Sequence, residues 1–412
     1  MATPFSASPA GVDMEVADLG RALAEAIAAL GPARERVCAV GVAGMAESGA
    51  PLRRGEPIGP VIAWHDGRGE ETVASLERRF GPDLARWTGR RVRTVSSVAK
   101  LGWLLDHGLP EPDRWLGVPE LVLFLLTGAE ATEYSLAART GAYDVIGRRF
   151  IPEVAGHLVP DGDPGALFPS VLPAGAVMGT LAPEAAGRFG LAEGIPVTIA
   201  GHDHLAAATG LGARPDDLLN SVGTAETLVR RLAAPPDVDL ALGLGLAVTV
   251  WPGGEAWGVL ASCARSGLVI DALAAHLGLD PDDLDVRAGS AAGGSPVTAD
   301  GTMVALGQGI EVPAGEPGGM WTATLVALAR RTAAGAERVR ALAGPHRRLV
   351  VFGGGSRSRV WLEVKEAETG VPVVVCPVSQ AAARGAALAA GVAARWWPSV
   401  AAGPGPRLKG GT

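Results

Sequence analysis

An aspartate on a glycine-tipped turn is the residue of this chain best suited to acid–base chemistry. Asp203 follows the apolar run 195–200 and precedes a run of small residues that is typical of a helix. A carboxylate held at the end of a strand and facing a cleft can accept the proton of a substrate hydroxyl. The turn therefore predicts that Asp203 acts as the general base in a reaction on an alcohol.

Two further turns have the composition of phosphate-binding loops. One follows the strand-like run 218–222, and the other follows 349–352 and precedes a helix. They consist of Gly223 and Thr224, and of Gly353, Gly354, Gly355 and Ser356. Backbone amides at such turns can hold phosphate oxygens, and glycine lets a nucleotide approach the backbone closely. Together with Asp203, these turns predict a kinase that transfers a phosphoryl group from ATP to a small molecule.

The second glycine turn also suggests a different function, that of an NAD-linked dehydrogenase. In the dinucleotide fingerprint, three glycines have a fixed spacing and an acidic residue ends the next strand. The third glycine of 353–355 falls at the wrong spacing, and no acidic residue follows in that role. The sequence therefore favours ATP, and the dehydrogenase hypothesis rests on the glycine turn alone.

Polar side chains at the ends of the first expected strands are candidates for substrate binding. A sugar or polyol needs groups that hydrogen-bond several hydroxyls, and strand-end loops hold such groups on a rigid base. We expect the substrate to contact Glu47, Trp64, His65, Asp66 and Arg68. Trp64 is expected to lie half in the core and half against the sugar.

Two histidines flank Asp203 and raise the question of a metal site. His202 and His204 flank Asp203 in a segment that we expect to be extended, and we expect their side chains to point away from each other. We therefore predict that no metal binds to this pair. One histidine, His202, is expected to line the substrate pocket.

Composition argues against several other classes of protein. The chain has 412 residues, of which 48% are hydrophobic, and a net charge of −7, and no cluster of lysine or arginine stands out. No nucleic-acid partner is expected, because binding to a phosphate backbone needs a basic face. The longest aliphatic run, 121–126, is too short to span a membrane, so no membrane partner is expected either.

Cysteine usage and the first residues indicate the cytoplasm. The three cysteines, Cys38, Cys263 and Cys376, are odd in number and lack a metal-type spacing. We expect them to be reduced and structural, as in cytoplasmic proteins. Residues 1–12 contain no basic segment before an apolar one, so no signal peptide is expected there.

Hydrophobic periodicity and turn residues predict alternating helices and strands. We expect helices over 13–30, 266–277, 321–342, from the turn at 353–356 to 369, and over 380–395, with mainly helix over 70–160. We expect strands over 36–43, 59–64, 241–250, 256–261, 349–352 and 371–376, a hairpin of 218–222 and 227–232, short strands within 170–200, and a long loop over 287–319.

Mixed strands followed by βα alternation predict an α/β fold of two domains with a cleft between them. The expected division is a sugar-binding domain over 1–200 and a nucleotide-binding domain over 201–397. The segment 398–412 is expected to be a flexible tail.

Several segments match the motifs of a known family. Ser97-Val-Ala-Lys100-Leu-Gly-Trp103-Leu-Leu-Asp106-His107 matches a signature of the form S/T/P-x-x-K-apolar-x-W-apolar-x-D/N-H/N. Further matches are Trp64-His-Asp66-Gly-Arg68, 126–128, 132–140, Gly201-His-Asp203, Gly223-Thr224 and Phe352-Gly-Gly-Gly-Ser356. On these motifs the chain resembles the FGGY family of carbohydrate kinases.

This resemblance implies the actin-like, ribonuclease-H-like ATPase fold, and phosphorylation of a sugar or polyol hydroxyl with ATP and Mg²⁺. It implies that Asp203 is the base, that Gly223 and Thr224 contact phosphate, and that residues 353–356 contact ATP. Lys100 and Trp103 belong to the signature, but their helical spacing favours a structural role. The resemblance leaves open which sugar is the substrate and whether the protein is a homodimer.

Two departures from the family pattern lead to an alternative function. The family opens with a strand and turn carrying D-x-G-T, whereas this chain resembles it only from the following segment, so we expect the N-terminal domain to lack its first strands. Where the family has P-x-x-x-G-E-R, residues 305–313 read Ala-Leu-Gly-Gln-Gly-Ile-Glu-Val-Pro. The alternative is a catalytically inactive sugar-binding or regulatory protein of the same fold.

Overall fold

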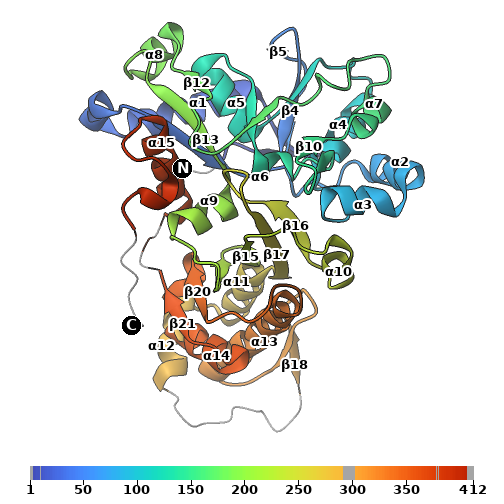
Figure 1. Ribbon diagram of the computed structural model, residues 1–412. Helices are drawn as coiled ribbons and strands as arrows, with labels where there is room; N and C mark the ends of the chain where they lie inside the picture. Colours follow the sequence, from blue (N-terminus) through green and yellow to red (C-terminus); the bar gives the residue numbers. More distant parts are fainter. Residues whose placement is uncertain (1–2, 10, 291–301, 377, 379, 406–412) are drawn as a thin grey trace.

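The computed structural model describes residues 3–9, 11–290, 302–376, 378 and 380–405. In the view of Figure 1 these residues form an upper and a lower part. The upper part contains the first half of the chain and one helix from near its end, and the lower part contains most of the second half.

A three-stranded sheet lies in the upper part and ends at the candidate base. Its order is β12-β13-β3, with the bounds Gly179–Thr180, Pro196–His202 and Val40–Gly44. β13 runs parallel to β3, with His202 opposite Gly44. Helices α5 (Val118–Thr127) and α15 (Ala381–Ala393) pack on this sheet, and β13 is buried from Val197 onward. The strand therefore presents His202 from a rigid base.

The other elements of the upper part are two small sheets, paired short strands and a set of helices. The sheets have the orders β1-β2-β6 (Ser6–Ser8, Gly11–Met14, Val61–Ile62) and β5-β4-β7 (Glu56–Pro57, Gly49–Arg53, Arg114–Gly117). The paired strands are β8 (Ala131–Glu133) with β11 (Ser170–Leu172), and β9 (Tyr143–Asp144) with β10 (Arg149–Phe150). The helices are α1 (Val16–Ala28), η1 (Gly31–Arg36), α2 (Glu70–Phe80), α3 (Pro82–Thr88), α4 (Ser97–Asp106), α6 (Tyr134–Ala137), α7 (Pro152–Leu158) and α8 (Pro183–Phe189).

A six-stranded sheet forms the centre of the lower part. Its order is β16-β17-β15-β14-β20-β21, with the bounds Ala247–Val250, Trp257–Ala264, Glu226–Leu232, Asp217–Val222, Arg348–Phe352 and Val373–Val375. β14 and β15 form the antiparallel hairpin that the sequence predicts. β14 and β20 are parallel, with Ser221 opposite Phe352. Because parallel strands end at the same edge, the turns that follow β14 and β20 lie side by side.

Helices cover this sheet and enclose a buried ion pair. The remaining elements are α9 (Asp203–Gly210), α10 (Val238–Gly243), α11 (Ser266–Leu277), α12 (Pro281–Ser290), β18 (Met303–Ala305), β19 (Glu311–Pro313), α13 (Pro317–Ala343), η2 (Gly354–Arg357), α14 (Arg359–Thr369) and η3 (Val400–Ala402). Lys365 of α14 pairs with Glu226 of β15, and both are fully buried. The hydroxyls of Thr332 and Ser266 donate to the same carboxylate at 2.6 and 2.7 Å.

Helix α15 returns from the lower sheet to the upper part of the molecule (Figure 1). It packs against α9, β3 and β13, and its small residues permit close approach. A Cβ at Gly41 of β3 would overlap the carbonyl oxygen of Ala386 on α15.

The expected domain limits at 200 and 397 stay a prediction. The same holds for the flexible tail, within which the structure describes η3 against α15.

Most elements expected from periodicity are present, and three regions differ. α11 has the expected limits, and the three helices expected after it are α13, α14 and α15. The expected strand over 241–250 is the end of α10 followed by β16, because Asp237 caps a helix there by accepting from the backbone N of Leu240. The region 170–200 contains α8, and the expected loop over 287–319 contains β18 and β19, while its residues 291–301 lie outside the described residues.

None of the helices in the described part of the chain combines the length and apolar character that a membrane span requires. Cys38, Cys263 and Cys376 are free thiols, as expected. Burial raises the pKa of the Cys263 thiol to about 12, so this side chain stays protonated.

Candidate active site

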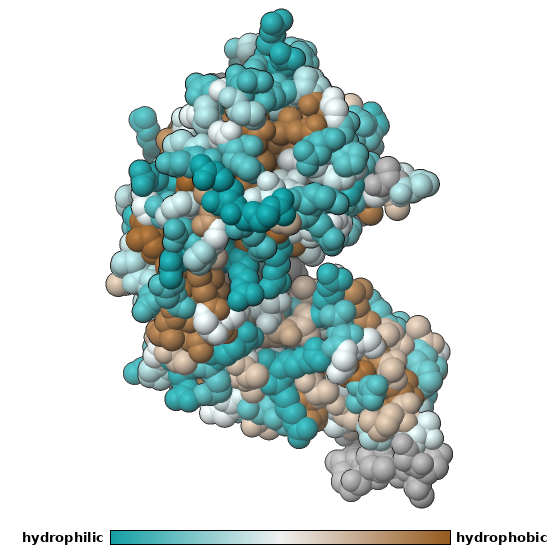
Figure 2. Space-filling model, turned by 90° about the vertical axis from the view of Figure 1, so that its right-hand side faces the viewer, coloured by the Kyte–Doolittle hydropathy of each residue, from teal (hydrophilic) through white to brown (hydrophobic). Residues whose placement is uncertain are grey.

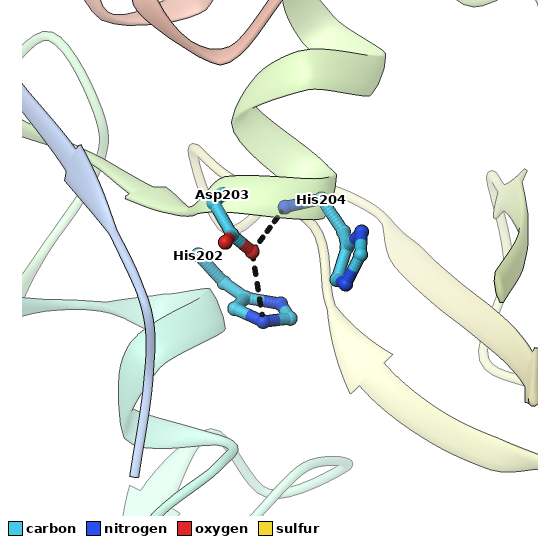
Figure 3. Close-up of side chains that lie close together, drawn as sticks. All are labelled: His202, Asp203 and His204. Atoms are coloured by element: carbon cyan, nitrogen blue, oxygen red, sulfur yellow. Dashed lines mark hydrogen bonds and ion pairs between the residues drawn. The ribbon is translucent and has the colours of Figure 1, made fainter. Parts of the chain in front are cut away.

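Asp203 lies at the junction of β13 and α9 and presents its carboxylate to solvent. The end of β13 needs glycine at position 201, because φ is +111° there and a Cβ would lie 2.5 Å from Oγ of Ser135. Oδ1 of Asp203 accepts a hydrogen bond from the backbone N of His204 at 2.7 Å and lies 3.2 Å from Nε2 of His202 (Figure 3). The side chain is 45% exposed. The carboxylate is therefore oriented through one oxygen while remaining reachable.

His202 is a buried, neutral neighbour of this carboxylate. Burial lowers the pKa of its imidazole to about 3, which outweighs the attraction of Asp203. Its backbone N donates to Oγ of Ser135 at 2.9 Å, and Glu133 in turn accepts from the backbone N of Ser135 at 2.8 Å. These bonds tie the end of β13 to the end of β8 and the start of α6.

The predicted divergence of His202 and His204 is wrong. Residues two apart in a strand lie on the same face, so an extended segment would not separate these side chains. In the structure β13 ends at His202 and α9 begins at Asp203. Their rings lie 5.2 Å apart, and both are close to the carboxylate in Figure 3. Ligand atoms of the three residues lie within 4.8 Å of one another. The expectation that no metal binds here stays a prediction, but alternation in a strand does not support it.

A cavity of about 640 Å³ opens beside Asp203 and takes its walls from both parts of the molecule. Figure 2 shows the notch that separates the two parts on one side of the surface. The upper wall contains Glu47, Trp64 and residues from the loop between α3 and α4. The lower wall contains Ala225 and Thr227 at the start of β15, together with the segment that joins α10 to β16. A molecule in this cavity would contact Asp203 and both parts of the protein.

Glu47 lies in the upper wall of the cavity, between two arginines. Its Oε1 accepts from Nε of Arg139 at 2.7 Å and from Nη1 of Arg90 at 3.2 Å. The backbone of Glu47 has a φ of +69°, which is uncommon for a residue with a side chain and is found most often at functional sites. This geometry holds the carboxylate at the cavity, and its contact with a substrate stays a prediction.

The structure brings together only some of the predicted substrate-binding residues. Glu47, Trp64 and His202 line the cavity, whereas His65, Asp66 and Arg68 do not. Asp66 is buried, and its carboxylate accepts from the backbone N of Val12 at 2.7 Å and from Nε of Arg68 at 2.8 Å. The bonds from Arg68 and Val12 outweigh the effect of burial and lower the pKa of Asp66 to about 2.

The substrate contacts expected of His65, Asp66 and Arg68 stay a prediction, and in this structure Asp66 and Arg68 position the chain. Arg68 also bonds to the carboxylate of Asp13 and lies over the ring of Trp103, so it ties β2 to α4. Buried Lys100 donates to the backbone carbonyl of Asp66. Sequence reasoning located these residues at a strand end but had no means to show that their polar atoms are already bonded.

The two glycine turns lie together at the edge of the lower sheet. Gly353 follows β20 with a φ of +95°, and a Cβ there would lie 2.5 Å from the carbonyl oxygen of Val222, which precedes Gly223. Gly223 and Thr224 are exposed, and a Cβ at Gly354 would meet no atom within 4 Å. The backbone N of Gly223 already donates to the carbonyl oxygen of Ala225 at 3.1 Å, so the other amides of this open, glycine-rich edge are those that fit the phosphates of a nucleotide. Ala225, the residue after Thr224, lines the same cavity as Asp203.

Four arginines of the cavity were not among the site residues predicted from the sequence. Arg90, Arg91, Arg93 and Arg139 all contribute to its walls. Three of them fall within four residues, just before the signature that begins at Ser97, and that spacing was a usable signal. The net charge of the chain gave no indication of this arginine cluster, because net charge does not depend on where the basic residues lie.

Comparison with known proteins agrees with this architecture. Residues 13–210 match the N-terminal domain, and residues 262–394 the C-terminal domain, of the FGGY family of carbohydrate kinases. A glycerol kinase of Trichlorobacter lovleyi is 30% identical over 423 residues, which cover 90% of this chain and 79% of that protein. The chain belongs to the FGGY family of carbohydrate kinases.

Other FGGY proteins match over different lengths. The L-fuculokinase of Escherichia coli K12 is 32% identical over 185 residues, which are 44% of this chain and only 39% of that protein. A ligand-bound xylulose kinase of Lactobacillus acidophilus superposes with a TM-score of 0.84 at 17% identity, covering 100% of this chain and 87% of that one. A xylulose kinase of Rhodospirillum rubrum has a TM-score of 0.77 at 24% identity, covering 95% of this chain and 84% of that one. The expected two-domain α/β fold of the actin-like ATPases is thereby confirmed.

Proposed function

We propose that this FGGY protein transfers the γ-phosphoryl group of ATP to a hydroxyl of a sugar or polyol, with Asp203 as the general base. The observation that supports this proposal most directly is the position of the Asp203 carboxylate. One of its oxygens is held by neighbouring groups, and the side chain faces a cavity that extends to the residue after the Gly223–Thr224 turn. Among the described residues, Oδ2 has no hydrogen-bond partner, so it is free to accept a proton.

The proposed reaction needs one proton acceptor and a means of placing two substrates. As the substrate oxygen bonds to the γ-phosphorus, the bond from that phosphorus to the β,γ-bridging oxygen breaks, and Asp203 takes the hydroxyl proton. Positioned proton transfer of this kind contributes about 10²–10⁴ in rate. Because His202 is neutral, it positions Asp203 without cancelling its negative charge.

The other roles are divided between the two walls of the cavity. Glu47 and Trp64 would bind the sugar through a carboxylate and an aromatic face. Gly223, Thr224 and the turn at 353–356 would bind the nucleotide. Mg²⁺ would neutralise charge on the triphosphate. Of the two carboxylates that line the cavity, Asp203 is the one that forms no ion pair with an arginine of the described residues.

Calorimetry with MgATP, followed by detection of ADP across a panel of sugars and polyols, tests the proposal. We expect heat of ATP binding and release of ADP that depends on a sugar. Binding of sugars without any turnover would support the inactive sugar-binding alternative. Absence of both ATP binding and turnover would overturn the kinase proposal.

A further inference from the structure

The upper wall of the cavity carries more positive than negative charge. The arginines and carboxylates that line the cavity are four and two in number: Arg90, Arg91, Arg93, Arg139, Glu47 and Asp203. The neutral His202 adds no charge. Asp203 is assigned to the reacting hydroxyl, so Glu47 is the carboxylate left to balance the arginines.

Glu47 does not balance even the two arginines that it contacts. Arg90 and Arg139 are 11% and 16% exposed, and both bond to the same oxygen of Glu47, which is itself buried. One carboxylate against two guanidinium groups leaves one positive charge in a poorly solvated position. Burial and the nearby Arg139 lower the pKa of Arg90 to about 10, which still leaves it charged at neutral pH.

Arg91 and Arg93 add to this charge from the same loop. Both are exposed, and both line the cavity. Within the described part of the chain, no carboxylate lies within ion-pair distance of either guanidinium. The loop between α3 and α4 therefore offers the cavity two planar groups whose donors are free for a ligand.

We infer that the substrate of this cavity carries a negatively charged group, a carboxylate or a phosphate, that contacts the arginines of the loop between α3 and α4. The inference rests on the proposed kinase function and narrows its substrate class. Guanidinium binds carboxylate and phosphate oxygens through paired, charge-assisted hydrogen bonds. A neutral polyol would leave the excess positive charge of this wall uncompensated.

The position of the arginines separates them from the proposed nucleotide site. They come from the upper part of the molecule, next to Glu47 and Trp64, whereas both glycine turns belong to the lower sheet. The triphosphate is therefore not the anion that this wall is expected to bind. This distinction is measurable, because loss of an arginine should weaken binding of the sugar and leave binding of ATP unchanged.

Pairs of substrates that differ only in charge provide the first test. An aldonate and the alditol of the same carbon chain, such as gluconate with glucitol and xylonate with xylitol, differ only in a carboxylate in place of a hydroxymethyl group. We expect kcat/KM for the aldonate to exceed that for its alditol by about tenfold or more, as hydrogen bonds to charged groups allow. The 1-phosphate of each alditol forms a third arm, and preference for it over the aldonate would identify phosphate as the anion.

A double variant and a matched control provide the second test. Arg91→Gln with Arg93→Gln removes the two unpaired charges and leaves the bonds between Glu47, Arg90 and Arg139 in place. Arg78→Gln on α2 removes an exposed arginine outside the cavity. We expect the double variant to raise KM for the preferred anionic substrate about tenfold or more, with a smaller effect on the alditol and no change in KM for ATP, and the control to change none of these.

The results separate this inference from the kinase proposal. A higher kcat/KM for the alditols, or a rise in KM for ATP in place of the sugar, would overturn the inference while the kinase function stands. If no compound is phosphorylated, the kinase proposal fails, and calorimetric binding of each pair still decides the inference. Tighter binding of the aldonate that the double variant abolishes would support it, and equal binding within each pair would overturn it.

Discussion

Gly385 of α15 lies directly against the backbone of Ala206 on α9, so that a Cβ at this glycine would overlap the Ala206 carbonyl oxygen. Asp203 is the first residue of α9. A helix from near the end of the chain thus supports the helix that positions the candidate base. The spacing between the two helices is set by the absence of a side chain, and any added atom must move one of them.

Replacement of Gly385 by alanine should therefore destabilise the protein and slow the reaction. We expect a loss of about 1–3 kcal/mol in the free energy of unfolding, because backbone atoms cannot yield as a flexible side chain does. Gly187→Ala in α8 is the matched control, since its Cβ would meet no atom within 4 Å. That change should be neutral or stabilise by up to about 1 kcal/mol. Urea unfolding and kcat check both, and equal effects would contradict the packing argument.

Asp203→Asn should remove phosphorylation while leaving the fold intact. The amide keeps the shape of the side chain but cannot take the proton, so we expect kcat to fall by about 10²–10⁴ with little change in melting temperature. Asp216→Asn is a matched control, because its side chain is 44% exposed and lies outside the cavity. Retained turnover in the Asp203 variant would reject its role as general base.

Glu47→Gln should cost both stability and substrate affinity. Removing the carboxylate leaves Arg90 and Arg139 close together without an opposite charge, and breaking a buried ion pair in this way costs about 3–5 kcal/mol. Glu130→Gln removes a more exposed partner of Arg114 and should cost less than about 1 kcal/mol. Thermal and urea unfolding of the two variants give the comparison. Similar losses would show that Glu47 contributes nothing beyond a surface ion pair.

Lys365→Met should be one of the most destabilising single changes in the lower part. It leaves Glu226 fully buried without its cation, at a cost of about 3–5 kcal/mol, and adding Glu226→Gln should recover part of that loss. Arg330→Met is the control, because it removes a cation from an ion pair with another residue of α14, Glu368, that is exposed to solvent. It should change the free energy of unfolding by less than about 1 kcal/mol. Failure of the double variant to recover stability would argue against the charge as the cause.

Glu120 should make the stability of the protein depend on pH. Burial raises the pKa of its carboxyl from 4.5 to about 7, and Oε2 has no partner among the described residues. Between these values the folded state holds a proton that the unfolded state releases, so the free energy of unfolding falls as pH rises from 4.5 to 7. The loss contributed by this group is about 3 kcal/mol at most.

Glu120→Gln should flatten this dependence, because the amide does not titrate while its oxygen can still accept from Thr132. The variant should gain stability over wild type at pH 8 and differ little at pH 4.5. Urea titrations between pH 4.5 and 8 measure both slopes, with Glu153→Gln at an exposed position of α7 as the control. A wild-type slope in the Glu120 variant would show that other groups produce the pH dependence.

Periodicity and turn chemistry were enough to predict much of the lower sheet and its helices. α11 has the limits expected from its apolar spacing, and β14 and β15 form the expected hairpin. Local signals of this kind arise within one segment, so a single sequence reveals them. The helix α10 was missed because a short apolar run is compatible with either a helix or a strand until its neighbours are known.

The sequence by itself determined that Asp203 follows a strand whose end contains a glycine and that two glycine turns follow strands, because a residue's own type and near neighbours decide such features. Only the tertiary structure decided which polar side chains remain free. The carboxylate of Asp66 is already bonded to Val12 and Arg68, whereas Arg91 lines the cavity without an ion-pair partner among the described residues. Such differences depend on bonds between segments that lie far apart along the chain. The support of α9 by α15 likewise depends on contacts across almost two hundred residues, which no local pattern records.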